Sequence, residues 1–149
     1  MPEPMTPLEK AIEIAVRAHA GQKCKDGTPY VLHPLRLMSR MNTEEERMAA
    51  VLHDVVEDTH VTFEDLRAAG IPENVLEAVR LLTHEKETPY EDYVNKLKDH
   101  PVARRVKLAD LQDNSDIRRL KGIEDKDVER LRKYYRAWQI LRPTPGEAP

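Results

Sequence analysis

The sequence places histidine and carboxylate side chains where they could share a metal ion. In the segment 51–58, the adjacent His53 and Asp54 follow apolar residues, and Glu57 comes one turn later. On a continuous helix, adjacent residues lie about 100° apart and residues three or four apart share a side, so these three side chains would face one neighbourhood. Burying so many ionisable groups on an apolar helix is costly unless they are paired or bind a metal. The alternative is a partly exposed, acidic helix end.

Two other segments supply matching ligands. His33 lies among apolar residues at the expected start of a helix, and Asp110 directly follows the largely apolar run 106–109. The candidate metal ligands are therefore His33, His53, Asp54 and Asp110. Imidazole and carboxylate ligands without sulfur suit one divalent ion, Mn²⁺, Fe²⁺ or Zn²⁺. Cys24 is the only cysteine, which excludes an intrachain disulfide and a thiolate metal cluster.

The composition indicates that helices position these residues. The chain has 149 residues, of which 5% are aromatic and only five are glycine, which argues against a β-sandwich or barrel. This length suits one domain over residues 1–149, with a core over about 6–141 and frayed ends. We therefore expect a single all-α domain.

Caps and apolar spacing predict where the helices lie. Thr6 and Glu9 form a capping box that opens a helix through about residue 19, and Thr43 opens another that runs to about Glu57. Further helices are expected over 62–69, 72–82, 90–98, 102–111 and 125–141, and a possible extended segment over 28–32. Trp138 and Leu141 are expected in the core of the last helix.

Charge and hydropathy narrow the possible partners. The formal net charge is −3, which argues against a nucleic-acid binder, although residues 42–100 carry six basic and fifteen acidic side chains and both flanks are net positive. No apolar run approaches about 20 residues, so we expect no membrane span. The start of the chain does not resemble a signal peptide. We expect a cytoplasmic protein, and its oligomeric state stays open.

The candidate ligands carry a family resemblance. They resemble the HD-domain metal-dependent phosphohydrolases, whose metal pattern is H…HD…D, and more narrowly the hydrolase domain of RelA/SpoT-type alarmone enzymes and their stand-alone small relatives. The similarity covers about residues 11–138. It rests on Lys-Asp-Gly-Thr-Pro-Tyr at 25–30, His-Pro at 33–34, Leu-His-Asp-Val-Val-Glu-Asp-Thr at 52–59, Val-Lys-Leu-Ala-Asp at 106–110, and Asn114.

The resemblance implies an activity and a set of roles. Members of that group have an all-helical fold and use Mn²⁺ to remove the 3′-pyrophosphate of guanosine tetra- and pentaphosphate. His33, His53, Asp54 and Asp110 fall on the metal-ligand positions of the group, and Glu57 and Asp58 fall on its catalytic acidic pair. A metal-bound water would be the nucleophile at neutral pH, and Glu57 would orient or deprotonate that water.

Substrate contacts follow from the same resemblance. Lys23, Lys25 and Asn114 match positions near the nucleotide, and Tyr134 could stack on a base or sugar. The alternatives are a solvated basic loop and a packing residue of the helix. Cys24 stands where the group has an arginine used against guanine, and a thiol cannot replace that flat cation. Two other functions therefore stay open, namely hydrolysis of another phosphorylated nucleotide and nucleotide binding without turnover.

Other polar residues receive weaker predictions. The basic residues Arg104, Arg105, Lys107, Arg118, Arg119 and Lys121 could meet phosphates, but neighbours on a helix point different ways, so several would instead pair with the acidic segment. The remaining histidines, His19, His60, His84 and His100, are expected at the surface or in packing.

Overall fold

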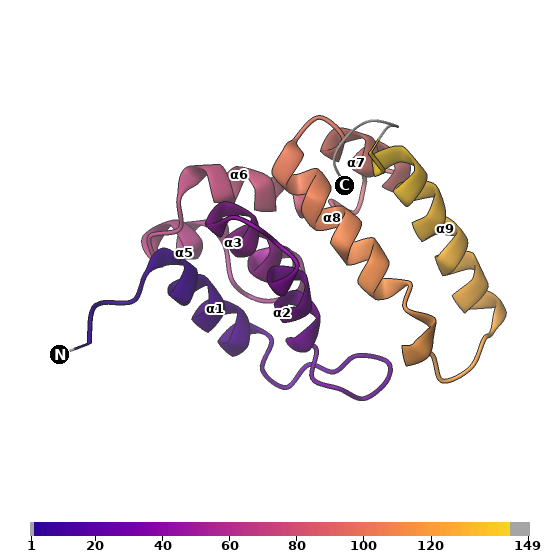
Figure 1. Ribbon diagram of the computed structural model, residues 1–149, viewed down its shortest axis with the longest axis horizontal. Helices are drawn as coiled ribbons and strands as arrows, with labels where there is room; N and C mark the ends of the chain where they lie inside the picture. Colours follow the sequence, from indigo (N-terminus) through magenta and orange to yellow (C-terminus); the bar gives the residue numbers. More distant parts are fainter. Residues whose placement is uncertain (1, 144–149) are drawn as a thin grey trace.

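The computed structural model describes residues 2–143 and confirms the predicted all-α fold (Figure 1). Its helices are α1 (Pro7–Ala18), α2 (Leu32–Ser39), α3 (Glu44–Leu52), α4 (Val55–Asp58), α5 (Phe63–Ala68), α6 (Glu73–Leu82), α7 (Tyr90–Leu97), α8 (Pro101–Asn114) and α9 (Asp125–Leu141), with a 3₁₀ turn at Ile117–Arg119. Within the described residues, extended pairing is limited to a single antiparallel bridge between Lys23 and Pro29. Over that same range, no helix is long and apolar enough to cross a membrane.

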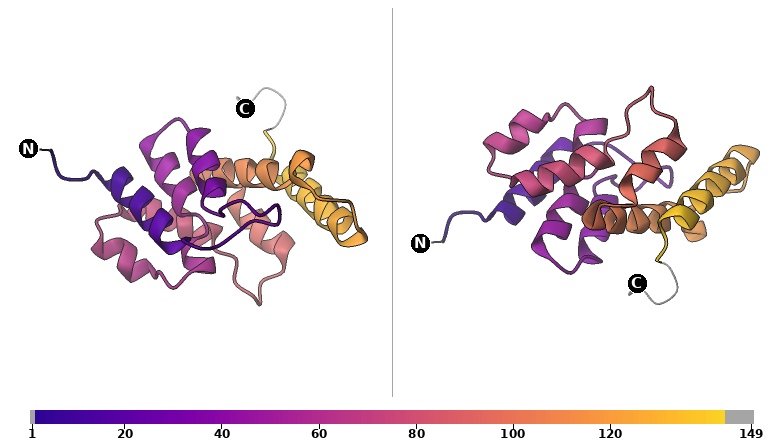
Figure 2. Two further views of the ribbon diagram at one scale, coloured as in Figure 1. Left: turned by 90° about the horizontal axis from the view of Figure 1, so that it is seen from below. Right: turned by 90° about the horizontal axis from the view of Figure 1, so that it is seen from above.

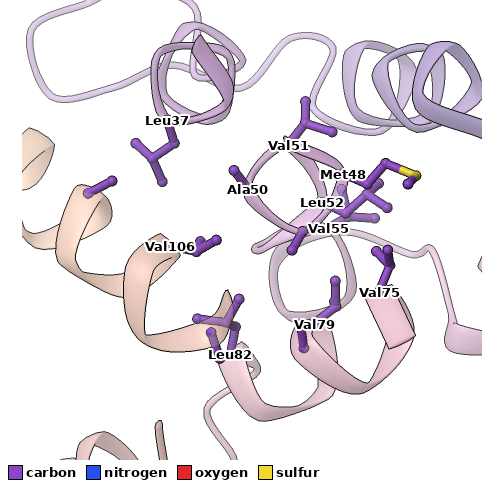
Figure 3. Close-up of a cluster of buried hydrophobic side chains, with 14 of the residues drawn as sticks. Leu37, Met48, Ala50, Val51, Leu52, Val55, Val75, Val79, Leu82 and Val106 are labelled. Carbon is purple, nitrogen blue, oxygen red and sulfur yellow. The ribbon is translucent and has the colours of Figure 1, made fainter. Parts of the chain in front are cut away.

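Helix α3 lies at the centre and packs against α1, α2, α6 and α8. Its C-terminal turn brings Val51 and Leu52 into a cluster with Val79 of α6 and Val106 of α8 (Figure 3). These four side chains are fully buried, and each contributes about 1.5–3 kcal/mol through burial. The centre of the bundle therefore holds the end of α3 in a fixed place, directly before His53.

Helices α8 and α9 form an antiparallel pair at the end of the molecule opposite α1 (Figures 1 and 2). Helix α9 makes its main helix contacts with α7 and α8. One side of α8 therefore faces the central bundle, while the other side supports α9. Residues of α8 can in consequence join the central helices to α9 at one site.

The predicted helix starts are confirmed by their caps. The side chains of Thr6, Thr43 and Thr62 each accept a hydrogen bond from the backbone N–H three residues later, and the acidic side chain at that later position accepts the backbone N–H of the threonine. Two further helices, α6 and α7, begin directly after Pro72 and Pro89. These starts were legible because capping depends on residues within one turn.

The single helix predicted over 43–57 is wrong. Helix α3 ends at Leu52, a turn at His53 and Asp54 follows, and α4 begins at Val55. The cause lies in the carbonyl of Ala50, which a continuing α-helix would offer to the N–H of Asp54. Here it accepts the backbone N–H of His53 at 3.4 Å and the imidazole Nδ1 of His53 at 2.7 Å.

Other element predictions also need correction. Within the predicted extended segment 28–32, extended pairing is limited to Pro29, residues 30–31 form a turn, and Leu32 already belongs to α2. Helix α8 begins at Pro101 and ends at Asn114, so it is longer than the predicted 102–111, and Asp110 lies within it as predicted. Leu141 is buried as predicted, but Trp138 is 40% exposed and does not belong to the core, because its ring stacks on the exposed Tyr135 in a surface pocket that Leu108 of α8 also lines.

Candidate metal centre

Three parts of the chain bring the four predicted ligands together. His33 comes from the first turn of α2, His53 and Asp54 come from the turn between α3 and α4, and Asp110 comes from α8. One ligand atom from each lies within 4.8 Å of the others. The two imidazoles and Asp110 are buried, and the Asp54 side chain is 18% exposed. The set is therefore nearly shielded from solvent and open on the side of Asp54.

The geometry at His53 fits a bound cation. Its Nδ1 donates to the carbonyl oxygen of Ala50, which leaves Nε2 with a lone pair when the ring is neutral. Nε2 is buried and has no hydrogen-bond partner, although Asp54 Oδ2 lies 2.9 Å away. A lone pair beside a carboxylate oxygen is repulsive unless a cation or proton lies between them. The donor set, two imidazoles and two carboxylates, fits a divalent ion such as Mn²⁺, Fe²⁺ or Zn²⁺.

The two ligand carboxylates are each held by a neighbouring donor. The Tyr30 hydroxyl donates to Asp54 Oδ2, and burial together with the Asp54 charge raises the Tyr30 pKa, so the phenol stays a donor. Lys107 Nζ donates to Asp110 Oδ2 at 2.8 Å, and Asn114 Nδ2 donates to Asp110 Oδ1 at 3.0 Å. Burial opposes the ionisation of Asp110, but Lys107 and the two imidazoles hold its pKa well below its usual range.

Glu57 and Asp58, the predicted acidic pair, occupy different places. A cavity of about 180 Å³ beside the cluster is lined by Glu57 but not by Asp58. The backbone N–H of His84 donates to Glu57 Oε1 at 2.7 Å, which fixes the carboxylate at the cavity wall. Partial burial and the nearby charges of Asp54 and Glu57 raise the Asp58 pKa to about 6. Glu57 is thus the acid placed in the cavity, and Asp58 lies outside that lining with a raised pKa.

The predicted substrate residues separate into two groups. Asn114 and Tyr134 line the cavity, together with His53, Asp54, Leu82, His84, Tyr90, Tyr93, Lys107, Asp110 and Lys133. Lys23 and Lys25 are exposed on the loop between α1 and α2 and do not belong to that lining. The structure therefore brings two of the four substrate residues to the cavity and leaves the two lysines outside it.

A groove lined by three basic side chains and by the acidic Glu91 and Glu129 adjoins the cavity. It lies between α7 and α9, measures about 650 Å³ and shares Tyr90 and Lys133 with the cavity. Arg130 and Arg136 also line it, and the Lys133 Nζ lies 4.1 Å from the centre of the Tyr90 ring. An anion that extends from the cavity along α9 would therefore meet three basic side chains.

Sequence reasoning missed several groups around the ligands. Tyr30 was seen only as part of a motif, Lys107 was considered only as a contact for phosphates or for the acidic segment, and Asp113, a buried partner of His33, was not singled out. One signal was present: Lys107, Asp110 and Asp113 are spaced three apart, which puts them on one side of a helix. The backbone N–H of His84 could not be found in this way, because it is 27 residues from Glu57.

The weaker predictions had mixed outcomes. His19 is a buried packing residue, with Nδ1 bonded to Gln22, and His84 stacks on Tyr93 at 4.6 Å between ring centres. Among the basic residues, Arg105 pairs with Glu46 of the acidic segment as predicted, while Lys107 reaches the candidate metal centre.

Several known proteins are similar in sequence to this chain. A Danio rerio protein named guanosine-3′,5′-bis(diphosphate) 3′-pyrophosphohydrolase is 31% identical over 93% of this chain and 84% of its own length. An Aquifex aeolicus protein of the same name is 30% identical over 76% of this chain. A Streptomyces coelicolor GTP pyrophosphokinase is 44% identical over 40% of this chain. The chain spans only 18% of the Aquifex protein and 8% of the Streptomyces protein.

A solved structure and a family pattern agree with these relatives. The structure, described as a metazoan ortholog of SpoT that hydrolyzes ppGpp, superposes with a TM-score of 0.80 at 27% sequence identity. The superposition covers 98% of this chain and 91% of the other. Residues 9–115, which include all four candidate ligands, match the HD domain family. The chain therefore belongs to the HD domain family.

Proposed function

We propose that this protein is a metal-dependent phosphohydrolase that removes the 3′-pyrophosphate from guanosine tetra- or pentaphosphate or a close nucleotide analogue. The observation that carries the proposal is the buried set of His33, His53, Asp54 and Asp110, which opens on a cavity that also holds Glu57. The names of the Danio and Aquifex relatives support this substrate. Mn²⁺ is the proposed ion, with Fe²⁺ and Zn²⁺ as alternatives.

His33, His53, Asp54 and Asp110 would hold the ion. A divalent ion in such a site lowers the pKa of a bound water and offsets negative charge on a phosphate. Tyr30 and Lys107 keep the two carboxylates of the set in place through the hydrogen bonds given above. The chain thus pre-arranges the ligands before any nucleotide enters.

The acidic pair would handle the protons. Hydrolysis joins a water oxygen to the phosphorus next to the 3′ oxygen and breaks the bond between that phosphorus and the 3′ oxygen. Glu57, fixed by the His84 N–H, would accept the proton of the attacking water. The departing 3′ oxygen takes up one proton, and Asp58, with a pKa of about 6, is the neighbouring group able to supply it. The products are guanosine diphosphate and pyrophosphate.

The groove between α7 and α9 supports a substrate with phosphates at two ends. When one phosphate group lies in the cavity, Lys133 and Arg136 would be available to a second, whereas Arg130 is paired with Asp127 at 3.0 Å. Tyr134, at the cavity wall, offers an aromatic face to the nucleoside between them. A nucleotide with phosphate at only one end would leave part of this cationic surface unused.

The remaining proposals concern the whole protein. We propose one HD-type hydrolase domain over residues 1–149 with its core at 6–141; residues 144–149 lie outside the described part. The proposed partner is a small nucleotide in the cytoplasm and not a nucleic acid, supported by the net charge of −3.

Purified protein with Mn²⁺ should release equimolar guanosine diphosphate and pyrophosphate from guanosine tetraphosphate, as measured by ion-exchange chromatography. A chelator and the Glu57→Gln variant serve as controls, and both should abolish release. A panel of other phosphorylated nucleotides tests the base, because Cys24 replaces the stacking arginine. Turnover of another nucleotide alone would favour the second hydrolase function, and nucleotide binding without any product would favour a binding module.

A further inference from the structure

Asp113 is a buried carboxylate that contacts the candidate ligand His33 at Nδ1, the ring nitrogen that faces away from Asp110. Only 2% of the residue is exposed. Its Oδ2 lies 2.7 Å from Nδ1 of His33, while the opposite ring nitrogen, Nε2, lies 2.9 Å from Asp110 Oδ1. His33 is thus clamped between two carboxylates of α8 that are one turn apart. Only Asp110 belongs to the set of candidate ligands.

Arginines from two other elements fix Asp113. Arg36 of α2 donates to both carboxylate oxygens, from Nε at 2.8 Å and from Nη2 at 2.9 Å. Arg119, from the 3₁₀ turn, donates to Asp113 Oδ2 at 3.3 Å, and Arg40 Nη2 lies 3.5 Å from Oδ1. A bidentate guanidinium–carboxylate pair is geometrically strict. Burial would raise the pKa of Asp113, but the bonds from His33 and Arg36 hold it far below its usual range, so the carboxylate stays charged.

We propose that Asp113, locked by Arg36, is a positioning residue that orients His33 and fixes the proton of this ring on Nδ1, so that Nε2 is the nitrogen presented to a divalent ion. A carboxylate that accepts the remaining N–H of a metal-binding histidine sets its tautomer and ring angle, and loss of such a partner typically costs about 10- to 100-fold in metal affinity. The proposal rests on the metal site of the proposed function.

The expected effect is on metal binding without nucleotide. Asp113→Asn keeps the shape of the side chain but replaces the carboxylate with an amide. The amide can turn either its oxygen or its N–H toward His33, so it no longer enforces one tautomer of that ring. Calorimetric titration of the metal-free protein with Mn²⁺ should show affinity lowered about 10- to 100-fold. Circular dichroism of the same samples checks that the variant is folded.

The chain offers a matched control three residues away. Asp116 also accepts two bonds from one guanidinium, at 2.9 Å and 2.7 Å from Arg118, but does not touch a histidine. Asp116→Asn should therefore leave the Mn²⁺ affinity unchanged. A second control, Asp113→Asn combined with Arg36→Gln, restores the local net charge. The Mn²⁺ affinity of this double variant should remain as low as that of Asp113→Asn alone, because both variants lose the orientation of His33, which restoring the net charge does not recover.

A direct measurement needs no substitution. In the Zn²⁺-loaded wild-type protein, proton–nitrogen NMR of the histidine rings should show His33 protonated at Nδ1 only. A proton on Nε2, or Mn²⁺ affinity of Asp113→Asn equal to that of Asp116→Asn, would overturn the proposal. So would full recovery of affinity in the charge-restored double variant. Failure of the wild-type protein to bind either ion would instead contradict the metal site itself.

Discussion

The metal cluster and the loop between α1 and α2 carry the two halves of the predicted site, and they are built in opposite ways. In the cluster, hydrogen bonds join residues far apart in sequence, such as His33 with Asp110 and Asp113, 77 and 80 positions later. Within residues 23–29 of the loop, the hydrogen bonds are local: Cys24 with Thr28, Gly27 with Cys24, and Thr28 with Asp26. The cluster is buried, whereas Lys23 and Lys25 of the loop are exposed.

This difference separates chemistry from recognition. A buried group must be held by its partners, because an unpaired charge away from water is costly. The cluster is therefore rigid before substrate arrives, and a single change there removes several interactions. The loop holds its own shape through Thr28, and its lysines remain hydrated and weakly constrained. Changes in the cluster should accordingly affect metal binding and turnover, while changes in the loop should affect only substrate affinity.

The largest effect is expected at Asp110. Asp110→Ala removes a candidate ligand, the partner of His33 and the partner of the buried Lys107 at once. Mn²⁺ affinity should fall by more than about 100-fold, which exceeds the loss of an outer partner, and pyrophosphate release should reach background. Calorimetry and a product assay measure the two effects. Retention of wild-type Mn²⁺ binding would remove Asp110 from the ligand set.

The next largest effect is expected at Glu57. Glu57→Gln preserves the shape and an oxygen that can accept the His84 N–H, but it cannot take a proton from water. We expect kcat to fall about 10²- to 10⁴-fold, with Mn²⁺ affinity within about twofold of wild type. Steady-state kinetics and calorimetry test the separation. Near-normal hydrolysis would show that Glu57 has no part in proton transfer.

The raised pKa of Asp58 predicts that the unfolding free energy of the protein depends on pH. Its pKa is raised from 3.8 to about 6, so the folded metal-free protein binds more protons than the unfolded chain between these values. The unfolding free energy should therefore fall as pH rises through that window. Asp58→Asn removes this loss, so the variant should be more stable than wild type at neutral pH and lose that advantage toward pH 3.8. Urea titrations measure this, with the exposed Asp99→Asn as control; equal stability at all pH values would contradict the prediction.

The smallest effect is expected in the loop. Lys25→Ala should raise KM about two- to fivefold at low salt, with kcat and Mn²⁺ affinity unchanged, because an exposed charge contributes at most about 1 kcal/mol. Lys23→Ala should have no larger effect, because the Lys23 side chain is also exposed. Steady-state kinetics at two salt concentrations separates the cases. A large fall in kcat for Lys25→Ala would show that the loop closes over the cavity during turnover.

The sequence by itself determined much of this protein. The low glycine and aromatic content predicted the all-α fold, and the threonine caps at 6 and 43 located two helix starts. The residue types at His33, His53, Asp54 and Asp110 predicted a sulfur-free metal set, and the structure brings those four together. These features were legible because capping and ligand chemistry depend on residue identity or on neighbours within one turn.

Only the tertiary structure decided how that set is supported and what reaches it. The turn at His53 replaces the expected continuous helix because the imidazole takes a carbonyl that the helix would have used. The contact between Asp113 and His33 depends on the packing of α2 against α8. The position of Lys25 outside the cavity lining is likewise a property of the folded chain. Contacts across about 80 positions depend on how helices pack around a shared core, and no local pattern in the chain encodes that packing.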